Sequence, residues 1–468
     1  MNLPLSRADH HQSTQDGHTT APTHVSTTIR PTIVYVHPHL TMRTGATNFV
    51  LNTAVGLQER GWPVVIVTGQ ADPAIVGERK LDIVELGGPL PSDPRHWMGL
   101  GGLERRVFAT LDRIPNKVLF PQVHPANYWA FAYKAARPWV PCVWMCHEPS
   151  AFVHSWSNIR SLTGPMRLAT MAANPALQVL DRLLVAQTDH IIANSRFTAS
   201  NVRRIYGRDA DAVVDSGLGP EAFDVPRIPR DCILSLGSLT RFKRGDLAPH
   251  GYALARRELG DKLPPLVIAG DGPELPKLRA LAAKLGIEKQ VCFTGRVSDA
   301  DKRLLYARAR LFIGTAPKEP FGLTPVEAMA AGAPVLAPDQ GGPSETVVDG
   351  ETGALYRSGD AADLARQLVG LFANPLRLAR MSAVARQHVC ARYTLGNTIA
   401  SLSDALDAFA VAEREHDARR YRSPAKRAAF SFDVAPGCRR AVRPRAKAGR
   451  AAAMSAASES THMGNRTN

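Results

Sequence analysis

Residues 32–69 read "TIVYVHPHLTMRTGATNFVLNTAVGLQERGWPVVIVTG". The stretch opens with the short apolar run "TIVYVHP", passes through a turn that contains Gly45, and continues as the helical pattern "ATNFVLNTAVGLQERG". Gly61 stands where a helix should end, and "PVVIVTG" is a second apolar run. A strand, a helix and a strand in this spacing are typical of a βαβ unit, so the stretch predicts a parallel sheet.

The same rhythm continues along the chain and then restarts. Further strands of the first series are expected from the apolar runs at residues 117–124, 142–149 and 190–195. The segment Pro220–Pro229, "PEAFDVPRIP", predicts a linker. Strands of a second series are expected at residues 230–239, 266–273, 291–297, 311–316 and 334–339. The sequence therefore predicts an α/β protein with two tandem Rossmann-like, doubly wound domains, whose ligand lies in the cleft between the two sheets.

The domain organisation follows from these two series and from two polar ends. The first domain is expected at residues 31–222, the second at 223–390, and helices at 391–418 are expected to return toward the first domain. Residues 1–30, rich in His, Thr and Gln, and residues 419–468 predict disordered tails. The second tail holds twelve Lys or Arg against two Asp or Glu, within a chain of formal net charge +15. Such a tail can adsorb to anionic lipid, and a solvated tail without a partner is the alternative.

Composition excludes several other classes of protein. The chain of 468 residues is 44% hydrophobic, and it contains no uninterrupted apolar run of about 18 residues, so a membrane-spanning helix is not expected. Cys142 and Cys146 are the one close pair of cysteines, and they fit a buried strand better than a metal site. No nucleic acid is expected as a partner, because no reading module accompanies the basic charge. The expected location is a reducing cytoplasm, with peripheral contact to the inner face of an anionic membrane.

A candidate anion site lies in residues 318–337, "KEPFGLTPVEAMAAGAPVLA". The helix expected from about Thr324 would point its free amides at the preceding loop, where Gly322 allows close approach of a ligand. Glu319 and Glu327 would supply carboxylates that accept hydrogen bonds from vicinal sugar hydroxyls, and Lys243 in "GSLTRFKRG" would supply a cation. Taken singly, each glutamate also fits a helix-dipole partner or a solvated residue.

The segment "EPFGLTPVEAMAAGAPVLA" resembles the E-x7-E donor-site motif of retaining GT-B glycosyltransferases of family 4. The resemblance extends over about residues 31–410. It is carried further by "VIAGDGPELPKLRALAAKLGIEKQVCFTGRV", "GGPSETVVDGETGALY", "ERGWPVVIVTG", "CHEPS" and "ANSRFTASNVRRIYG". It implies a GT-B fold and a hexosyltransferase that retains the anomeric configuration.

The resemblance also implies roles for individual residues. Glu319 would lie against the donor sugar, Glu327 would bind the ribose hydroxyls, and Lys243 would bind the diphosphate. His147 of "CHEP" would approach the reacting sugar, although a histidine at such a position also fits a satisfied core residue. Further donor contacts are implied at the backbone of Phe321, Gly322 and Leu323, and beside the base at Gly295 and Val297. The acceptor-side loop after the first strand would be Thr44, Gly45 and Ala46.

Two positions depart from the family's pattern. Ser238 stands five residues before Lys243, where the family commonly has an arginine on the diphosphate. The acceptor-side loop reads "TGAT" instead of Gly-Gly-x-Glu. The first departure keeps open an alternative, an inactive relative that binds nucleotide sugars and acts as an interaction protein.

The donor and acceptor are expected from the resemblance as well. "CHEP" and "FKRGDL" look most like members that use GDP-mannose to build lipid-linked or surface polysaccharides, and a UDP-sugar donor is the alternative. A glycan or lipid-linked acceptor is expected, and residues 95–106 could meet a lipid interface or form a plain amphipathic helix. No cofactor and no metal are expected. The Asp-x-Asp string at 299–301 fits a helix cap at Ser298 instead.

Overall fold

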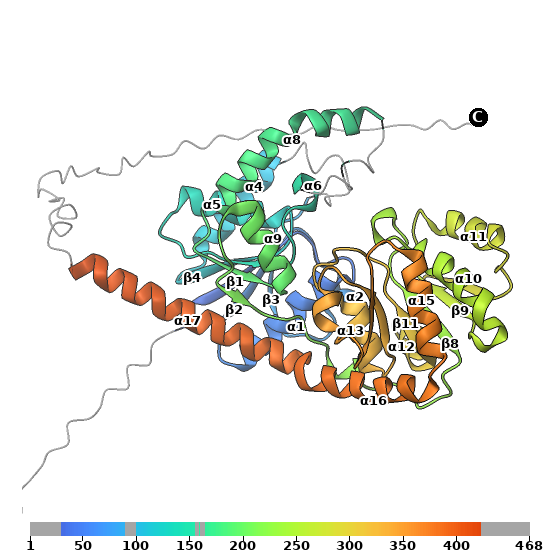
Figure 1. Cartoon of the computed structure of the whole chain (residues 1–468). Helices are drawn as coiled ribbons and strands as arrows, with labels where there is room; N and C mark the ends of the chain where they lie inside the picture. The colour runs from blue at the N-terminus through green and yellow to red at the C-terminus, as the bar shows by residue number, and fades with distance from the viewer. Residues whose placement is uncertain (1–29, 89–99, 155–158, 160–163, 423–468) are drawn as a thin grey trace, which may run out of the picture. The chain divides into compact units, whose positions relative to one another are not determined.

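The computed structural model describes residues 30–88, 100–154, 159 and 164–422 of the chain (Figure 1). The disordered tails predicted at 1–30 and 419–468 lie almost wholly outside the described residues. The lipid-facing stretch predicted at 95–106 lies partly outside them, and its described part belongs to helix α4, Leu100–Arg113. Among the described residues, no helix is both long enough and apolar enough to cross a membrane.

The N-terminal half contains two neighbouring parallel sheets. The first has the order β3-β2-β1-β4, made by β1 (Thr32–His37), β2 (Val64–Thr68), β3 (Asp82–Glu85) and β4 (Lys117–Pro121). The second has the order β5-β6-β7, made by β5 (Val143–Cys146), β6 (His190–Ala193) and β7 (Ala212–Val213). A single bridge between Leu119 and Cys142 links β4 to the segment before β5.

Helices cover both faces of these strands, because side chains alternate along a strand. Ile33 and Tyr35 of β1 belong to one buried cluster, and Val34 and Val36 belong to the other. The first cluster includes residues of α1 (Gly45–Glu59), and the second includes residues of α4 and α5 (Ala126–Ala136). The remaining helices of this half are α2 (Pro73–Val76), α6 (Ala151–His154), α8 (Gly164–Val185) and α9 (Arg196–Tyr206).

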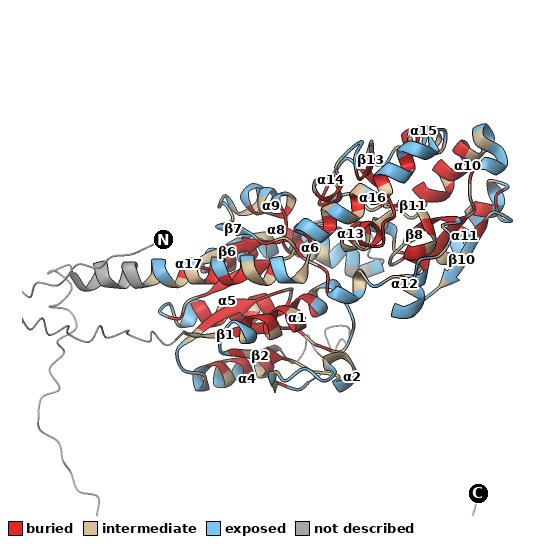
Figure 2. Ribbon diagram, turned by 90° about the horizontal axis from the view of Figure 1, so that it is seen from below, coloured by how far each residue is buried: buried red, intermediate tan, exposed pale blue. Residues whose placement is uncertain are grey.

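The C-terminal half contains one parallel sheet of the doubly wound type, with the order β10-β9-β8-β11-β12-β13. Its strands are β8 (Cys232–Leu236), β9 (Leu266–Ala269), β10 (Val291–Gly295), β11 (Ala309–Ile313), β12 (Val335–Pro338) and β13 (Gly353–Tyr356). Alternation divides this sheet as well, since Leu311 and Ile313 face one buried cluster and Phe312 faces the other. Figure 2 shows buried residues along the strands and exposed residues on the outward sides of the helices.

The helices of this half are α10 (Leu247–Leu259), α11 (Leu275–Lys284), α12 (Asp299–Arg308), α13 (Leu323–Ala330), α14 (Pro343–Thr346), α15 (Ala361–Phe372) and α16 (Pro375–Arg392). Short 3-10 turns lie at η1 (Pro220–Ala222), η2 (Arg241–Lys243) and η3 (Gly260–Lys262). The last helix, α17 (Leu395–Arg422), contributes Leu402, Leu406 and Phe409 to the same buried cluster as Ile33. The domain bounds themselves stay predictions.

The predicted α/β fold is confirmed, and so are several local details. Gly207 ends α9 in the left-handed conformation, with φ 68°, and the Ser298 side chain caps α12 by accepting from the Asp301 amide. The sequence analysis did not predict β3, β7 and β13. All three lie at sheet edges. "DIVE" is partly exposed and half charged, β7 has only two residues, and "GALY" is buried but begins with glycine, so each carries a weak apolar signal.

Candidate active site

The loop between β11 and α13 is held against the loop between β12 and α14. Gly322 adopts φ 90° immediately before α13 begins, a conformation that favours glycine. The Gly342 amide donates to the Glu319 carbonyl at 2.7 Å, and a Cβ on Gly342 would approach the Phe321 backbone to within 2.3 Å. Phe321 is buried and meets Tyr393 edge to face. These contacts fix the backbone of Glu319 to Leu323 at the amide end of α13.

Lys243 and Glu319 form a half-buried ion pair at this loop. The Lys243 Nζ donates to both carboxylate oxygens of Glu319 at 2.7 Å. Lys243 ends the 3-10 turn η2, and its carbonyl accepts a 2.9 Å hydrogen bond from the Thr315 hydroxyl, just beyond β11. The structure thus brings together two predicted site residues that are 76 positions apart in the sequence.

Glu327 occupies a second polar site one turn into α13. One of its oxygens accepts from the Tyr306 hydroxyl at 2.7 Å and the other from the Lys302 Nζ at 3.0 Å. Burial, followed by the Glu327 charge, raises the pKa of the Tyr306 phenol well above its usual value, so this group stays a donor. Glu327, Leu323 and Gly45 all line a cavity of about 270 Å³. A carboxylate oxygen has two lone pairs, so each can accept a further hydroxyl.

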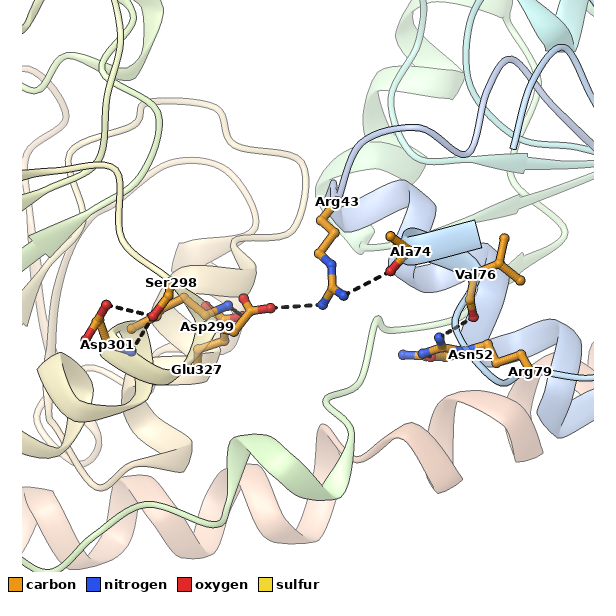
Figure 3. Close-up of polar contacts among 10 residues, drawn as sticks. Arg43, Asn52, Ala74, Val76, Arg79, Ser298, Asp299, Asp301 and Glu327 are labelled. Carbon is orange, nitrogen blue, oxygen red and sulfur yellow. Dashed lines mark hydrogen bonds and ion pairs between the residues drawn. The ribbon is translucent and has the colours of Figure 1, made fainter. Parts of the chain in front are cut away.

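The loop predicted on the acceptor side contributes Gly45 to the lining of this cavity. Thr44 caps α1 by accepting from the Thr47 amide at 3.1 Å. A Cβ on Gly45 would lie 2.9 Å from the end of the Leu323 side chain, so the loop passes close to α13 and Leu323 would have to shift to admit a larger residue. Arg43 donates to Asp299 at the start of α12 at 3.0 Å and to the Ala74 carbonyl at 3.4 Å (Figure 3). Ala46 is half-buried in the first turn of α1.

His147 lies at the carboxyl end of β5, where the Gln122 amide oxygen is 3.0 Å from its Nε2. Its ring meets Phe49 edge to face at 4.9 Å. Burial lowers the pKa of the imidazole to about 4. The role predicted for His147 toward the sugar stays a prediction.

Glu148, the next residue, was missed by the sequence analysis. Burial raises the pKa of its carboxyl, the Lys243 charge lowers it, and the Glu319 charge raises it again. Glu148 retains solvent contact but interacts electrostatically with the ion pair of the C-terminal half. Nearby, the Ser195 hydroxyl at the end of β6 donates to the Pro320 carbonyl at 2.5 Å. The one signal for Glu148 in the sequence was its place beside His147 in "CHEPS".

The remaining residues predicted at the donor lie at the ends of β8 and β10. Ser238, predicted at the diphosphate in place of the family's arginine, is exposed in the loop that follows β8. Gly295 ends β10 with φ 69°, and its carbonyl accepts from the Gly270 amide at 2.9 Å. Val297 packs against the buried cluster that contains Phe321. The structure places these residues around the same edge of the sheet, and their contacts to a donor stay predictions.

Two buried, neutral histidines, His37 at the end of β1 and His147 just after β5, make the stability of the fold depend on pH. Burial, and then the charges of His147 and His39, lower the pKa of His37 to about 3, whereas the usual value is 6.5. Above pH 6.5 the unfolded chain also holds these imidazoles neutral, so their contribution to stability is complete. Between pH 6.5 and about 4 the unfolded chain binds protons that folded His37 and His147 do not, so stability falls as pH falls.

We expect the melting temperature to decrease from pH 7 to pH 5, because each such histidine costs at most about 1.4 kcal/mol per pH unit. A His37→Gln variant should show a smaller decrease, since one of these protonation differences is gone. Thermal unfolding of both proteins across this range checks the prediction. Parallel curves for wild type and variant would contradict it, whatever the absolute stability of the variant.

Comparisons with known proteins agree on one family of sequences. Two family models match the chain: Glycosyltransferase Family 4 over residues 43–214, and Glycosyl transferases group 1 over residues 225–388. A D-inositol 3-phosphate glycosyltransferase from Streptomyces coelicolor is 32% identical over 337 residues, which cover 59% of this chain and 73% of that protein. The same enzyme from Stackebrandtia nassauensis is 27% identical over 418 residues, or 82% of this chain and 90% of that protein.

A third relative and two solved structures extend the comparison. An alpha-1,3/1,6-mannosyltransferase from Neurospora crassa is 26% identical over 393 residues, covering 72% of this chain and 81% of that protein. The Anabaena protein HepE in complex with UDP-glucose aligns with a TM-score of 0.63 and 18% identity, over 81% of this chain and 100% of that chain. Sucrose-phosphate synthase from Thermosynechococcus elongatus aligns with a TM-score of 0.65 and 19% identity, over 82% of this chain and 100% of that chain. At these identities the two structures show a common fold.

Proposed function

The chain belongs to glycosyltransferase family 4, with the GT-B fold, and is a glycosyltransferase; from this premise we propose that it transfers mannose from GDP-mannose with retention of configuration. The acceptor would be a glycan or lipid-linked sugar in the synthesis of a surface polysaccharide or glycolipid. The observation that carries the proposal is the pairing of Lys243 with Glu319 beside the amide end of α13, with Glu327 on the same helix.

The proposed chemistry places charge stabilisation at the diphosphate. When the bond between the anomeric carbon and the phosphate oxygen breaks, the leaving diphosphate gains negative charge and the sugar becomes cationic. The Lys243 ammonium and the amides around Gly322 would stabilise the diphosphate, the largest contribution expected in a site of this kind. Glu319 would hold Lys243 in place and accept a hydroxyl of the sugar. The acceptor hydroxyl would attack from the same face and give its proton to the departing phosphate oxygen.

This scheme assigns no carboxylate nucleophile and no metal. Among the described residues, no group of three or more His, Cys, Asp or Glu converges on a metal-binding arrangement. That the reaction needs no metal and no cofactor stays a prediction, which addition of a chelator to the assay would check.

Asp299 supports GDP over UDP as the nucleotide. It lines the same cavity as Glu327, which would bind the ribose, and so stands within the reach of a base. Guanine presents two adjacent N–H donors on its pairing edge, which match the two oxygens of a carboxylate, whereas uracil presents one donor between two carbonyls. The Arg43–Asp299 pair is solvent-exposed and therefore weak enough for a base to displace.

We expect wild-type protein to release GDP from GDP-mannose faster than UDP from UDP-glucose, and an Asp299→Asn variant to lose about tenfold of this preference. The estimate follows from the strength of hydrogen bonds to charged groups, about 1.5–3 kcal/mol, reduced for an exposed site. Steady-state release of each nucleotide measures the ratio. Asp301→Asn is the matched control, since Asp301 lies in the same turn of α12 but does not line the cavity.

Two alternatives predict different results in the same assay. A UDP-sugar-dependent enzyme, in keeping with the UDP-glucose bound to HepE, would release UDP faster and would be indifferent to Asp299. An inactive relative, for which Ser238 in place of arginine is the argument, would bind a nucleotide but release none from either donor. Release of GDP above background from GDP-mannose would exclude the inactive relative.

A further inference from the structure

Helix α8, Gly164–Val185, is amphipathic in the opposite sense to the other helices of its half. Its polar residues face inward: Asn174 and Asp181 are buried, and Gln178 is half-buried and donates to the Val153 carbonyl at 3.4 Å. Most of its large apolar residues face outward, except Leu184 and Val185 at its end, which pack against the core. The outward-facing residues include Leu168, 71% exposed, Val179, 55%, Leu180, 49%, and Leu183, 59%.

The spacing of these residues shows that the outward face is continuous. At 100° per residue, Leu168, Val179 and Leu183 fall on one side of the helix, and the alanines at 169, 172, 173 and 176 fill the places between them. All four alanines are exposed. Asn174, Gln178 and Asp181 lie on the opposite, packed side, and the exposed Arg182 borders the apolar face next to Leu168. Figure 1 shows α8 on the outside of the N-terminal half, away from its sheets.

The inward contacts prevent the helix from turning its leucines into the protein. One oxygen of the buried Asp181 accepts from the Tyr128 hydroxyl at 2.5 Å, and the other lies 2.5 Å from Nε2 of His154. Rotation of α8 would expose the leucines less but would leave Asp181, Tyr128 and His154 without these partners in the interior. Breaking a buried hydrogen-bonded carboxylate costs several kcal/mol, so the observed orientation is the stable one.

An outward apolar face of this kind marks an interaction site, and its charges indicate which partner fits. Asp181 is the one acidic residue in the sequence of α8, and it is buried. Arg182, on the flank of the apolar face, donates to the Ile205 carbonyl of α9, and Arg203 and Arg204 lie exposed in the last turn of that helix. Asp209 pairs with Arg203, and Arg204 keeps its positive charge without an acidic partner among the described residues.

We propose that the outward face of α8 docks on an anionic membrane surface. Leu168 to Leu183 span about 23 Å at about 1.5 Å per residue, a length that lies flat at the boundary between headgroups and acyl chains. The leucines and Val179 enter the acyl region, and the arginines of α8 and α9 meet the phosphates. This surface is separate from the donor site, so the proposal holds or fails independently of the nucleotide and sugar.

The test is co-sedimentation of the full chain with vesicles of equal parts phosphatidylcholine and phosphatidylglycerol, compared with vesicles of phosphatidylcholine alone. We expect binding to the anionic vesicles, and a Leu180→Glu/Leu183→Glu variant should lower the partition roughly tenfold by placing charge on the inserted face. The basic C-terminal tail is present in both proteins, so adsorption through the tail does not distinguish them. Leu376→Glu is the matched control, because Leu376 is 84% exposed on α16; its binding should equal that of wild type.

Several outcomes would overturn the proposal. Equal binding of wild type and the double variant would assign vesicle binding to the tail, and absence of binding by wild type would exclude the membrane altogether. A wild-type dimer in sedimentation velocity that the double variant converts to a monomer, without a change in vesicle binding, would assign the face to a second copy of the chain. Both leucines are exposed, so melting temperature and nucleotide binding of the variant should stay at wild-type values.

Discussion

Replacing Lys243 by methionine is expected to lower kcat/KM by about 100- to 1,000-fold, because the leaving diphosphate would lose the cation that we propose stabilises its developing charge. Methionine keeps the apolar stem of the side chain, so packing around η2 changes little. The loss should fall mainly on kcat, since the charge is greater in the transition state than in the bound donor. Steady-state release of GDP from GDP-mannose measures both constants.

The Lys243→Met substitution should also affect two neighbouring carboxylates, Glu319 and Glu148. Glu319 loses the donor that contacts both of its oxygens, and the carboxyl of Glu148 loses the charge that lowers its pKa. The pKa of Glu148, already raised by burial, should therefore rise further in the variant. Lys277→Met serves as the control, because Lys277 lies exposed on α11 and pairs with Glu274 outside the site. A loss of less than tenfold at Lys243, or an equal loss at Lys277, would contradict the proposed role.

Replacing Glu327 by alanine should remove most of the stabilisation that a nucleoside diphosphate gives to the protein. A ligand that binds the folded state raises the melting temperature in proportion to the logarithm of its concentration over Kd. Hydrogen bonds from ribose hydroxyls to a carboxylate are worth about 1.5–3 kcal/mol, so we expect Kd for GDP to rise about 10- to 100-fold. Thermal unfolding with and without GDP gives the shift for each protein.

The control for Glu327 must separate the carboxylate from its neighbours. The substitution also leaves the buried Tyr306 hydroxyl and Lys302 without their partner, which lowers the stability of the free protein. Tyr306→Phe removes the 2.7 Å hydrogen bond but keeps the carboxylate. It should therefore retain most of the shift produced by GDP. Equal shifts in wild type and Glu327→Ala would show that the ribose is bound elsewhere.

Much of the fold could be predicted from the sequence because its determinants are local. A strand buried on both faces is a short apolar run, and a glycine that ends a helix is recognisable one residue at a time, as at Gly207. The loop from Glu319 to Glu327 could also be predicted, because a strand end, a glycine and a helix start are adjacent in the sequence. The edge strands β3, β7 and β13 were not predicted, since β7 has two residues, "DIVE" is half charged and "GALY" begins with glycine.

The contacts that join distant segments were decided only by the tertiary structure. The sequence alone determined the two parallel series, the donor-loop motif and the residues Lys243, Glu319 and Glu327 as candidates. The structure decided that Lys243 pairs with Glu319, that Glu148 interacts with this pair, and that Arg43 contacts Asp299. It also turned the polar side of α8 inward, toward Tyr128 and His154. The physical reason is that a helix pattern defines two faces but does not say which is buried; that depends on hydrogen-bond partners contributed by other parts of the chain.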